Sequence, residues 1–152
     1  MGLINNIEVR PLESVKGGTV DFYTPQSSHE TMLVQIPPAT VEDLFVHRFQ
    51  TDQLLVVRGS FVLVVLRNRQ YDYIPLIDSQ PTVVKVPAGI VHSAINLSSE
   101  TCVVVNAVLR HGTPHERDYQ PIKPPFPYDL ELAQAKLTEV TCSTNPPLLA
   151  VN

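Results

Sequence analysis

Short apolar stretches, separated by polar and turn-forming residues, run along the chain as far as Leu109. Several of them alternate between apolar and polar positions, which is the period of a strand with one buried face. The run Phe61–Leu66 is apolar throughout and predicts a strand covered on both faces. The pattern predicts strands over Thr19–Tyr23, Met32–Ile36, Leu44–Phe49, Gln53–Val57, Phe61–Leu66, Tyr71–Leu76, Thr82–Val86, Val91–Leu97 and Cys102–Leu109.

The pattern changes after Arg110, where prolines become too frequent for long regular elements. Tyr128–Leu137 has apolar residues on one side and predicts a short helix, with Asp129 as its N-cap. Residues 141–152 have the composition of a mobile tail. We expect an N-terminal arm over residues 1–18, a β-domain over 19–119, and a proline-rich segment with the helix and tail over 120–152.

Composition narrows the class of protein. The length of 152 residues suits one domain, and 14 prolines favour many short strands. A net charge of −4 argues against a nucleic-acid partner, which would require a basic face. The apolar runs are too short to cross a membrane, and the N-terminus does not have the pattern of a secretory signal. We expect a cytoplasmic protein whose two cysteines, Cys102 and Cys142, are reduced.

Two segments contain the candidate chemistry. The first reads His-x-Phe-x-x-x-Gln-x-x-x-x-x-Gly over residues 47–59, and the second reads Pro-x-Gly-x-x-His-x-x-x-Asn over residues 87–96. Alternation puts Phe45, His47 and Phe49 on one face of the first strand. The Pro-Gly corner precedes His92 in the second segment. We expect His47 and His92 to face one shared cavity.

These two motifs resemble the paired motifs of the cupin superfamily. The resemblance implies an all-β fold: a small cupin β-barrel or jelly roll, here with a short C-terminal helix, that often pairs into a homodimer. A full cupin metal site takes two histidines and a glutamate from the first motif and a histidine from the second. Phe49 and Gln53 stand where two of those ligands would be, so we expect no metal and no other cofactor.

Within the superfamily, the glutamine and the Pro-x-Gly-x-x-His corner resemble the dTDP-4-dehydrorhamnose 3,5-epimerases and the dTDP-sugar 3,4-ketoisomerases. The segment HERDYQP also resembles the region after the last barrel strand in the ketoisomerases. The resemblance implies a metal-independent isomerase whose small-molecule ligand is a nucleotide sugar. It makes His47 the general base, with His92 as a second catalytic residue. Phe49, Gln53, Asn96, Asn106 and Tyr119 would line the ligand site.

Two alternatives remain open. Leu55 replaces the family's lysine, and Asn106 lies in the region where the epimerases have a tyrosine, so the barrel could be a non-catalytic binder of a small ligand. The second alternative is a metal-dependent cupin enzyme with an incomplete ligand set. His29, His111 and His115 fall in expected loops, where exposure is the default. Tyr71, Tyr73 and Tyr119 are expected to be packing residues rather than proton donors.

Overall fold

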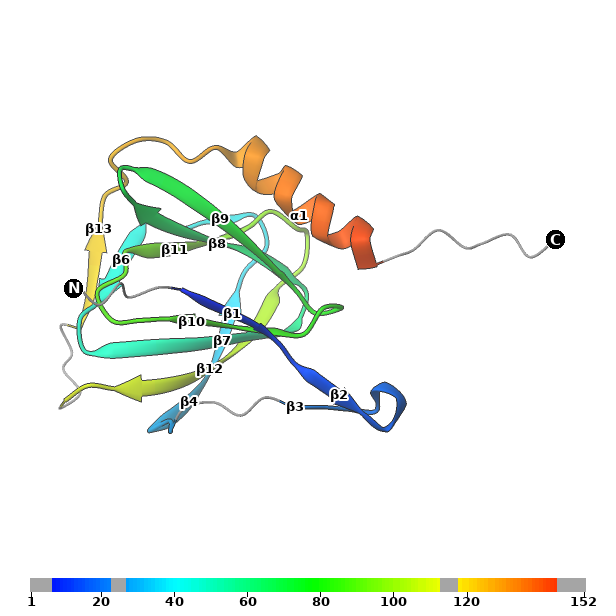
Figure 1. The fold of residues 1–152 in the computed structure, drawn as a ribbon. Helices are drawn as coiled ribbons and strands as arrows, with labels where there is room; N and C mark the ends of the chain where they lie inside the picture. Colours follow the sequence, from blue (N-terminus) through cyan, green and yellow to red (C-terminus); the bar gives the residue numbers. More distant parts are fainter. Residues whose placement is uncertain (1–6, 23–26, 113–117, 145–152) are drawn as a thin grey trace.

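The computed structural model describes residues 7–22, 27–112 and 118–144. Two antiparallel sheets face each other, and one helix lies across the outside of the second sheet (Figure 1). The elements are β1 (Glu8–Pro11), β2 (Glu13–Val15), a short 3-10 turn (Lys16–Gly18), β3 (Val20–Phe22), β4 (Glu30–Ile36), β5 (Thr40–Val41), β6 (Leu44–His47), β7 (Gln50–Arg58), β8 (Ser60–Arg67), β9 (Gln70–Ile77), β10 (Thr82–Val86), β11 (His92–Asn96), β12 (Cys102–Arg110), β13 (Tyr119–Ile122) and α1 (Leu130–Thr144).

The first sheet has five strands in the order β1-β10-β7-β12-β4. The second runs β13-β6-β11-β8-β9, with β5 paired to β11, and β2 and β3 form a separate hairpin. Apart from the β8–β9 hairpin, neighbouring strands in both sheets are distant in the sequence, as in a jelly roll. This arrangement brings β6, β7 and β11, which hold the candidate residues, around one interior.

The core lies between the two sheets. Strand β8 contributes Phe61, Leu63 and Val65 to this interior, while its alternate residues Val62 and Val64 pack on the other side with Ala133 and Leu137 of α1. The prediction of a strand covered on both faces is therefore confirmed for Phe61–Leu66. Tyr73 is also buried under the helix, as expected of a packing residue.

The C-terminal region differs from the prediction. The Asp129 carboxylate accepts a hydrogen bond from the Leu132 amide at 2.9 Å, so the predicted N-cap is confirmed. The helix nevertheless continues to Thr144, past the predicted end at Leu137 and into the predicted tail. Sequence reasoning also missed β13, because Pro121 within it is typical of non-regular structure. Proline is tolerated there because β13 is an edge strand of its sheet.

Several smaller features of the chain can also be described. Gly59 has a φ of 87° at the turn between β7 and β8, a value that glycine adopts without strain. Both cysteines are free thiols, with Cys102 buried and Cys142 exposed. No helix within the described residues is long and apolar enough to cross a membrane. Tyr23 and His115, like residues 145–152 of the expected tail, lie outside the described residues.

Candidate functional site

A cavity of about 370 Å³ opens between the two sheets. One part of its wall is apolar and comes from strands of both sheets: Val34, Ile36, Leu54, Phe61, Leu63 and Val104. The remaining wall contains most of the polar residues, including both His47 and His92, together with Met32, Phe45 and Ala94. The cavity therefore offers one apolar and one ionisable region to a small ligand.

His47 is the last residue of β6, and both its backbone and its ring have neighbours that position them. Its backbone pairs with Tyr119 of β13, and its ring lies 5.4 Å from the ring of Phe45, centroid to centroid. The side chain is 15% exposed, so the imidazole is mostly buried and lies at the cavity surface. This position leaves the ring accessible to a ligand.

His92 is the first residue of β11, directly after the Pro-Gly corner. The His92 Nδ1 atom lies 2.8 Å from the Ile90 carbonyl oxygen, and because a carbonyl can only accept, Nδ1 carries the proton of that bond. The other nitrogen, Nε2, is then directed to Asp52, whose Oδ2 atom is 3.4 Å away. The ring centroids of His47 and His92 are 6.0 Å apart.

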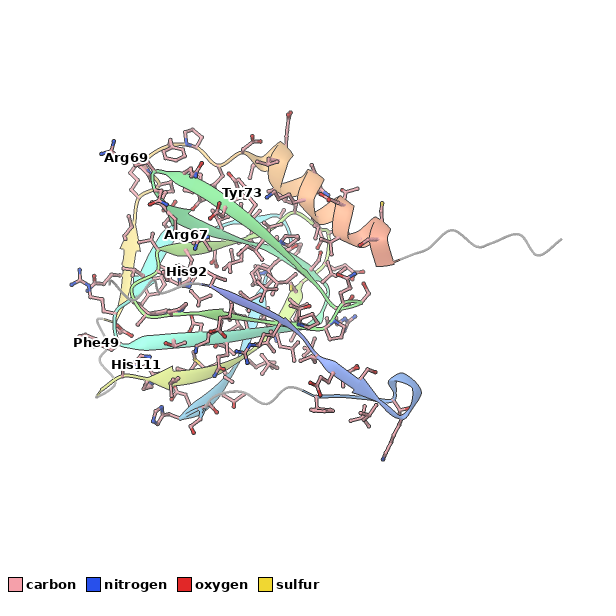
Figure 2. The ribbon with its side chains drawn as sticks, in the orientation of Figure 1. Phe49, Arg67, Arg69, Tyr73, His92 and His111 are labelled. Atoms are coloured by element: carbon pink, nitrogen blue, oxygen red, sulfur yellow. The ribbon has the colours of Figure 1, made fainter. Side chains whose placement is uncertain are left out.

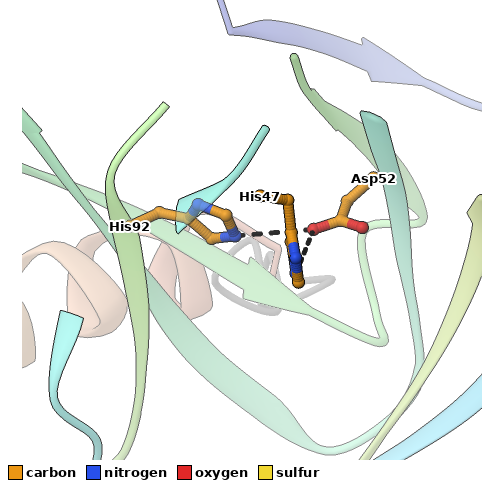
Figure 3. A group of neighbouring side chains, drawn as sticks. All are labelled: His47, Asp52 and His92. Carbon is orange, nitrogen blue, oxygen red and sulfur yellow. Dashed lines mark ion pairs between the residues drawn. The ribbon is translucent and has the colours of Figure 1, made fainter. Parts of the chain in front are cut away.

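Asp52 of β7 is the charged centre of the group (Figure 3). Its Oδ1 atom accepts hydrogen bonds from the Gln50 side chain at 2.6 Å and from the Asn106 side chain at 2.9 Å. Its Oδ2 atom faces both imidazoles, 3.4 Å from His92 Nε2 and 3.8 Å from His47 Nε2. One buried carboxylate therefore joins the two predicted histidines.

Asp118 lies on the other side of His47. The backbone amides of Arg48 and Phe49 donate to its Oδ1 atom at 2.8 and 3.0 Å, which fixes the carboxylate. Its Oδ2 atom is 3.9 Å from His47 Nδ1, and neither atom has a hydrogen-bond partner among the described residues. His47 thus stands between two carboxylates, one at each ring nitrogen.

Burial and these charges shift the protonation equilibria of the group. Burial lowers the pKa of His47 below its usual value of 6.5, although Asp52 and Asp118 oppose that effect. Burial raises the pKa of Asp52, but hydrogen bonds from His92, Asn106 and Gln50 outweigh it and leave the pKa below its usual value. At neutral pH, His47 is therefore largely neutral and Asp52 is ionised.

No family model matches the chain, and no curated protein matches it. Solved structures do match. A dTDP sugar isomerase from Desulfovibrio desulfuricans is 12% identical with a TM-score of 0.64, covering 78% of this chain and 85% of that one. QdtA, a sugar 3,4-ketoisomerase from Thermoanaerobacterium thermosaccharolyticum, is 13% identical with a TM-score of 0.62, covering 93% and 98%. The capsular polysaccharide assembling protein CapF from Staphylococcus aureus is 19% identical with a TM-score of 0.56; the match covers 66% of this chain and 27% of CapF.

The chain folds as a small cupin barrel. Matches at such low identity establish the fold alone. That fold agrees with the two facing antiparallel sheets and the short C-terminal helix described above. The predicted fold class is therefore confirmed.

The cupin barrel brings together some of the predicted site residues. His47, His92, Asn106 and Tyr119 all line the cavity. Figure 2 shows His92 in the interior and Phe49 at the end of the barrel, close to His111.

The structure does not bring the other three predicted residues into the cavity. Phe49 is 51% exposed, because β6 ends at His47 and the alternation does not continue past it. Gln53 is buried, and its side chain donates to the Ala107 carbonyl on the neighbouring strand. Asn96 is also buried, and its side-chain amide donates to the Ile36, Pro37 and Glu100 carbonyls, so it ties the turns at the far end of β11.

Sequence reasoning missed Asp52 and Asp118. Alternation along β7 puts Asp52 on the same face as Leu54 and Val56, both of which contact the interior. The continuous run of apolar residues from Leu54 to Val57 obscured this pattern. Asp118 lies within the segment HERDYQP that drew attention in the sequence, but only the backbone pairing of β13 with β6 brings it to His47.

The lowered pKa of His47 gives a direct prediction. We expect the ring protons of His47, followed by NMR, to titrate below 6.5. Asp118→Asn should lower the pKa further, because it removes a negative charge that favours the imidazolium. Asp72→Asn, which changes an exposed carboxylate on β9, is the matched control and should leave the titration of His47 unchanged. Titration of His47 above 6.5, or no response to Asp118→Asn, would contradict the assigned geometry.

Proposed function

We propose that the chain is a cupin-type sugar-nucleotide epimerase or isomerase that works without a metal, with His47 as the general base. The observation that carries the proposal is the placement of His47 between the carboxylates of Asp52 and Asp118 at one side of an open cavity, with His92 facing the same Asp52 oxygen. The likeness of the fold to proteins named as sugar isomerases supports the same class of reaction. These enzymes are named for acting on keto sugars or sugar nucleotides, and that substrate class is part of the proposal.

His47 has the properties of a base for proton abstraction beside a ketone. Its lowered pKa keeps a lone pair available at neutral pH. When the base takes a proton from the carbon next to the ketone, the electron pair of the C–H bond moves to the carbonyl oxygen and forms an enolate. The new imidazolium is then stabilised by Asp52 and Asp118, whose distances of 3.8 and 3.9 Å can shorten to hydrogen bonds once His47 is charged.

His92 is suited to the second role, stabilisation of the enolate oxygen. Its Nδ1 atom donates to Ile90, so Nε2 can also donate only when the ring is an imidazolium. The Asp52 Oδ2 atom lies 3.4 Å from this nitrogen. In the proposed reaction, the Nε2 proton of His92 is donated to the developing oxyanion, while the fixed Nδ1 bond keeps the ring in place.

The size of the cavity limits how much of the substrate it holds. About 370 Å³ lies at the lower end of the range for small-molecule sites, roughly 300–1,000 Å³. We assign the cavity to the keto sugar ring, whose carbon–hydrogen bond must reach His47. The nucleotide would lie at the mouth, beside the half-exposed ring of Tyr119.

A non-catalytic binder of a neutral small ligand is the second candidate, and the charge of the cavity favours it. Glu42, Asp52 and Asp118 line the wall, and the Arg110 side chain there is already bound to Glu30 and Gln50. Three acidic groups and a neutralised cation disfavour a diphosphate inside the cavity. This candidate retains the fold and the cavity but makes the histidines ligand-contacting residues rather than catalysts.

We also propose that the chain forms a cytoplasmic homodimer through the outer face of the first sheet. Leu33, Val105 and Leu55 are cross-strand neighbours on that face, and Leu33 is 66% exposed. Helix α1 covers the other sheet, so it does not shield this row (Figure 1). The two free cysteines support a reducing compartment.

The enzyme proposal predicts isotope exchange. The protein incubated in D₂O with a 4-keto sugar nucleotide should incorporate deuterium at the carbon beside the ketone, measured by mass spectrometry. His47→Ala should lower the exchange rate by about 10²–10⁴-fold, the usual contribution of a positioned base. The melting temperature should change little, because the side chain lines the cavity and does not belong to either core cluster.

The control for this experiment is His111→Ala, which removes an exposed histidine outside the cavity and should retain exchange. Binding of the nucleotide sugar without any exchange by the wild-type protein would refute the enzyme proposal and favour the binder. Equal exchange by wild type and His47→Ala would remove His47 from the base role.

The dimer proposal predicts a solution mass of twice the 16.9 kDa chain, measured by light scattering after size exclusion. Leu33→Lys should shift the protein to the monomer, because it puts a charge into the proposed apolar contact. Leu132→Lys on α1 is the matched control, since Leu132 is 43% exposed on the other side of the molecule. A monomeric wild-type protein, or a dimer that only the control variant disrupts, would be contrary to the proposal.

A further inference from the structure

Three electron-pair donors meet at one point of the cavity. The Nε2 atoms of His47 and His92 lie 3.8 and 3.4 Å from Asp52 Oδ2, and all three atoms lie within 4.8 Å of one another (Figure 3). Because the His92 Nδ1 proton is used by Ile90, a neutral His92 directs its Nε2 lone pair at a carboxylate oxygen. That arrangement is repulsive unless a cation lies between the atoms. That cation can be a proton on His92 Nε2 or a metal ion.

The supporting contacts are those of a metal centre. Metal-binding histidines usually direct the second ring nitrogen at a carbonyl or a carboxylate, which orients the ring. His92 Nδ1 bonds the Ile90 carbonyl, and His47 Nδ1 faces Asp118 Oδ2 at 3.9 Å. The free oxygen of Asp52 is likewise oriented, because Gln50 and Asn106 both bond the other oxygen. All three candidate ligands are therefore held by a second group.

We propose that a divalent transition-metal ion binds His47 Nε2, His92 Nε2 and Asp52 Oδ2, and that it competes there with the protons used in the proposed reaction. Sequence reasoning expected no metal because it counted Phe49 and Gln53 as the missing ligands; Asp52 was not considered. Asp52 approaches the histidines from a different position on β7 and supplies the negative charge that Gln53 does not.

The donor set indicates which ions fit. Two imidazoles and one carboxylate suit Zn²⁺ or Co²⁺ better than Mg²⁺ or Ca²⁺, which prefer oxygen ligands. Ligands bound tetrahedrally to zinc stand roughly 3.4 Å apart, from bond lengths of about 2.1 Å. The two distances to Asp52 are close to this value, so a modest movement of the His47 ring completes the triangle. All three residues also line the cavity.

Metal binding has a consequence for the proposed base. A bound metal takes the Nε2 lone pair of His47 and replaces the proton of His92, so both groups lose the ability to transfer a proton. We therefore expect Zn²⁺ to inhibit the reaction. This inhibition rests on the proposed function, whereas the binding itself does not.

Binding is tested on the full-length, tag-free protein, stripped of metal with chelator, by Co²⁺ titration. We expect one Co²⁺ per chain and the intense visible absorption of a tetrahedral site. Asp52→Asn and His92→Gln should each weaken binding by at least about tenfold, since even loss of a group that only orients a ligand costs about 10–100-fold. Because Asp52 and His92 are both buried, a thermal unfolding curve must first establish that each variant is folded. If one of them does not fold, His47→Gln, at the cavity surface, replaces it in the test.

Matched controls are Asp72→Asn and His111→Gln, an exposed carboxylate and an exposed histidine outside the cavity. Both should bind Co²⁺ like the wild type. Absence of saturable binding at millimolar Co²⁺ would overturn the proposal. Binding that survives all three site variants, or that His111→Gln abolishes, would also overturn it, because the ion would then be at a surface site.

The competition is tested separately. Zn²⁺ should suppress deuterium exchange with the same midpoint as it displaces Co²⁺ from the spectroscopic site, and chelator should restore exchange. Exchange that requires the metal would refute the competition and the metal-independent reaction, while the Co²⁺ spectrum would still report the site. If the protein catalyses no exchange, the enzyme proposal is refuted. The proposed metal site is then tested by the Co²⁺ absorption spectrum alone.

Discussion

The interior position of the Asp52 carboxylate is the constraint on which the site depends. A charge removed from water is costly unless hydrogen bonds and an opposite charge replace its solvation. Gln50 and Asn106 satisfy one oxygen, and the two imidazoles face the other. The lowered pKa of Asp52 means that these interactions outweigh the cost of burial. The polar wall of the cavity is thus built around one buried anion that its hydrogen-bond donors stabilise.

The barrel makes this arrangement possible because it collects strands that are distant in sequence. His47 ends β6, Asp52 lies in β7, and His92 begins β11. Asp118 joins them because β13 pairs with β6 in register, Tyr119 opposite His47. The apolar core below and the helix on the outside of β8 and β9 hold the strands in place. The chemistry of the site therefore depends on pairings across the fold rather than on one local motif.

Local patterns predicted much of this structure but not all of the site. The Phe61–Leu66 run predicted a doubly covered strand, and the two motifs predicted that His47 and His92 share a cavity. Gln53 was chosen over Asp52 because the motif spacing pointed to it, whereas the strand's alternation directs Asp52 inward. The apolar run Leu54–Val57 is compatible with either Asp52 or Gln53 facing the interior. Only the register of β7 in the folded sheet decides which of the two does. Asp118 and β13 depend on tertiary pairing, which no local pattern contains.

The central claim, that one Asp52 oxygen serves both imidazoles, can be tested in a single NMR measurement. Two-bond proton–nitrogen correlation spectra of the histidine rings report the charge and proton at each ring nitrogen. If the claim holds, Asp52→Asn shifts the Nε2 resonances of both His47 and His92, while those of the exposed His29 and His111 remain in place. A shift confined to one of the two buried rings, or to neither, would contradict the account.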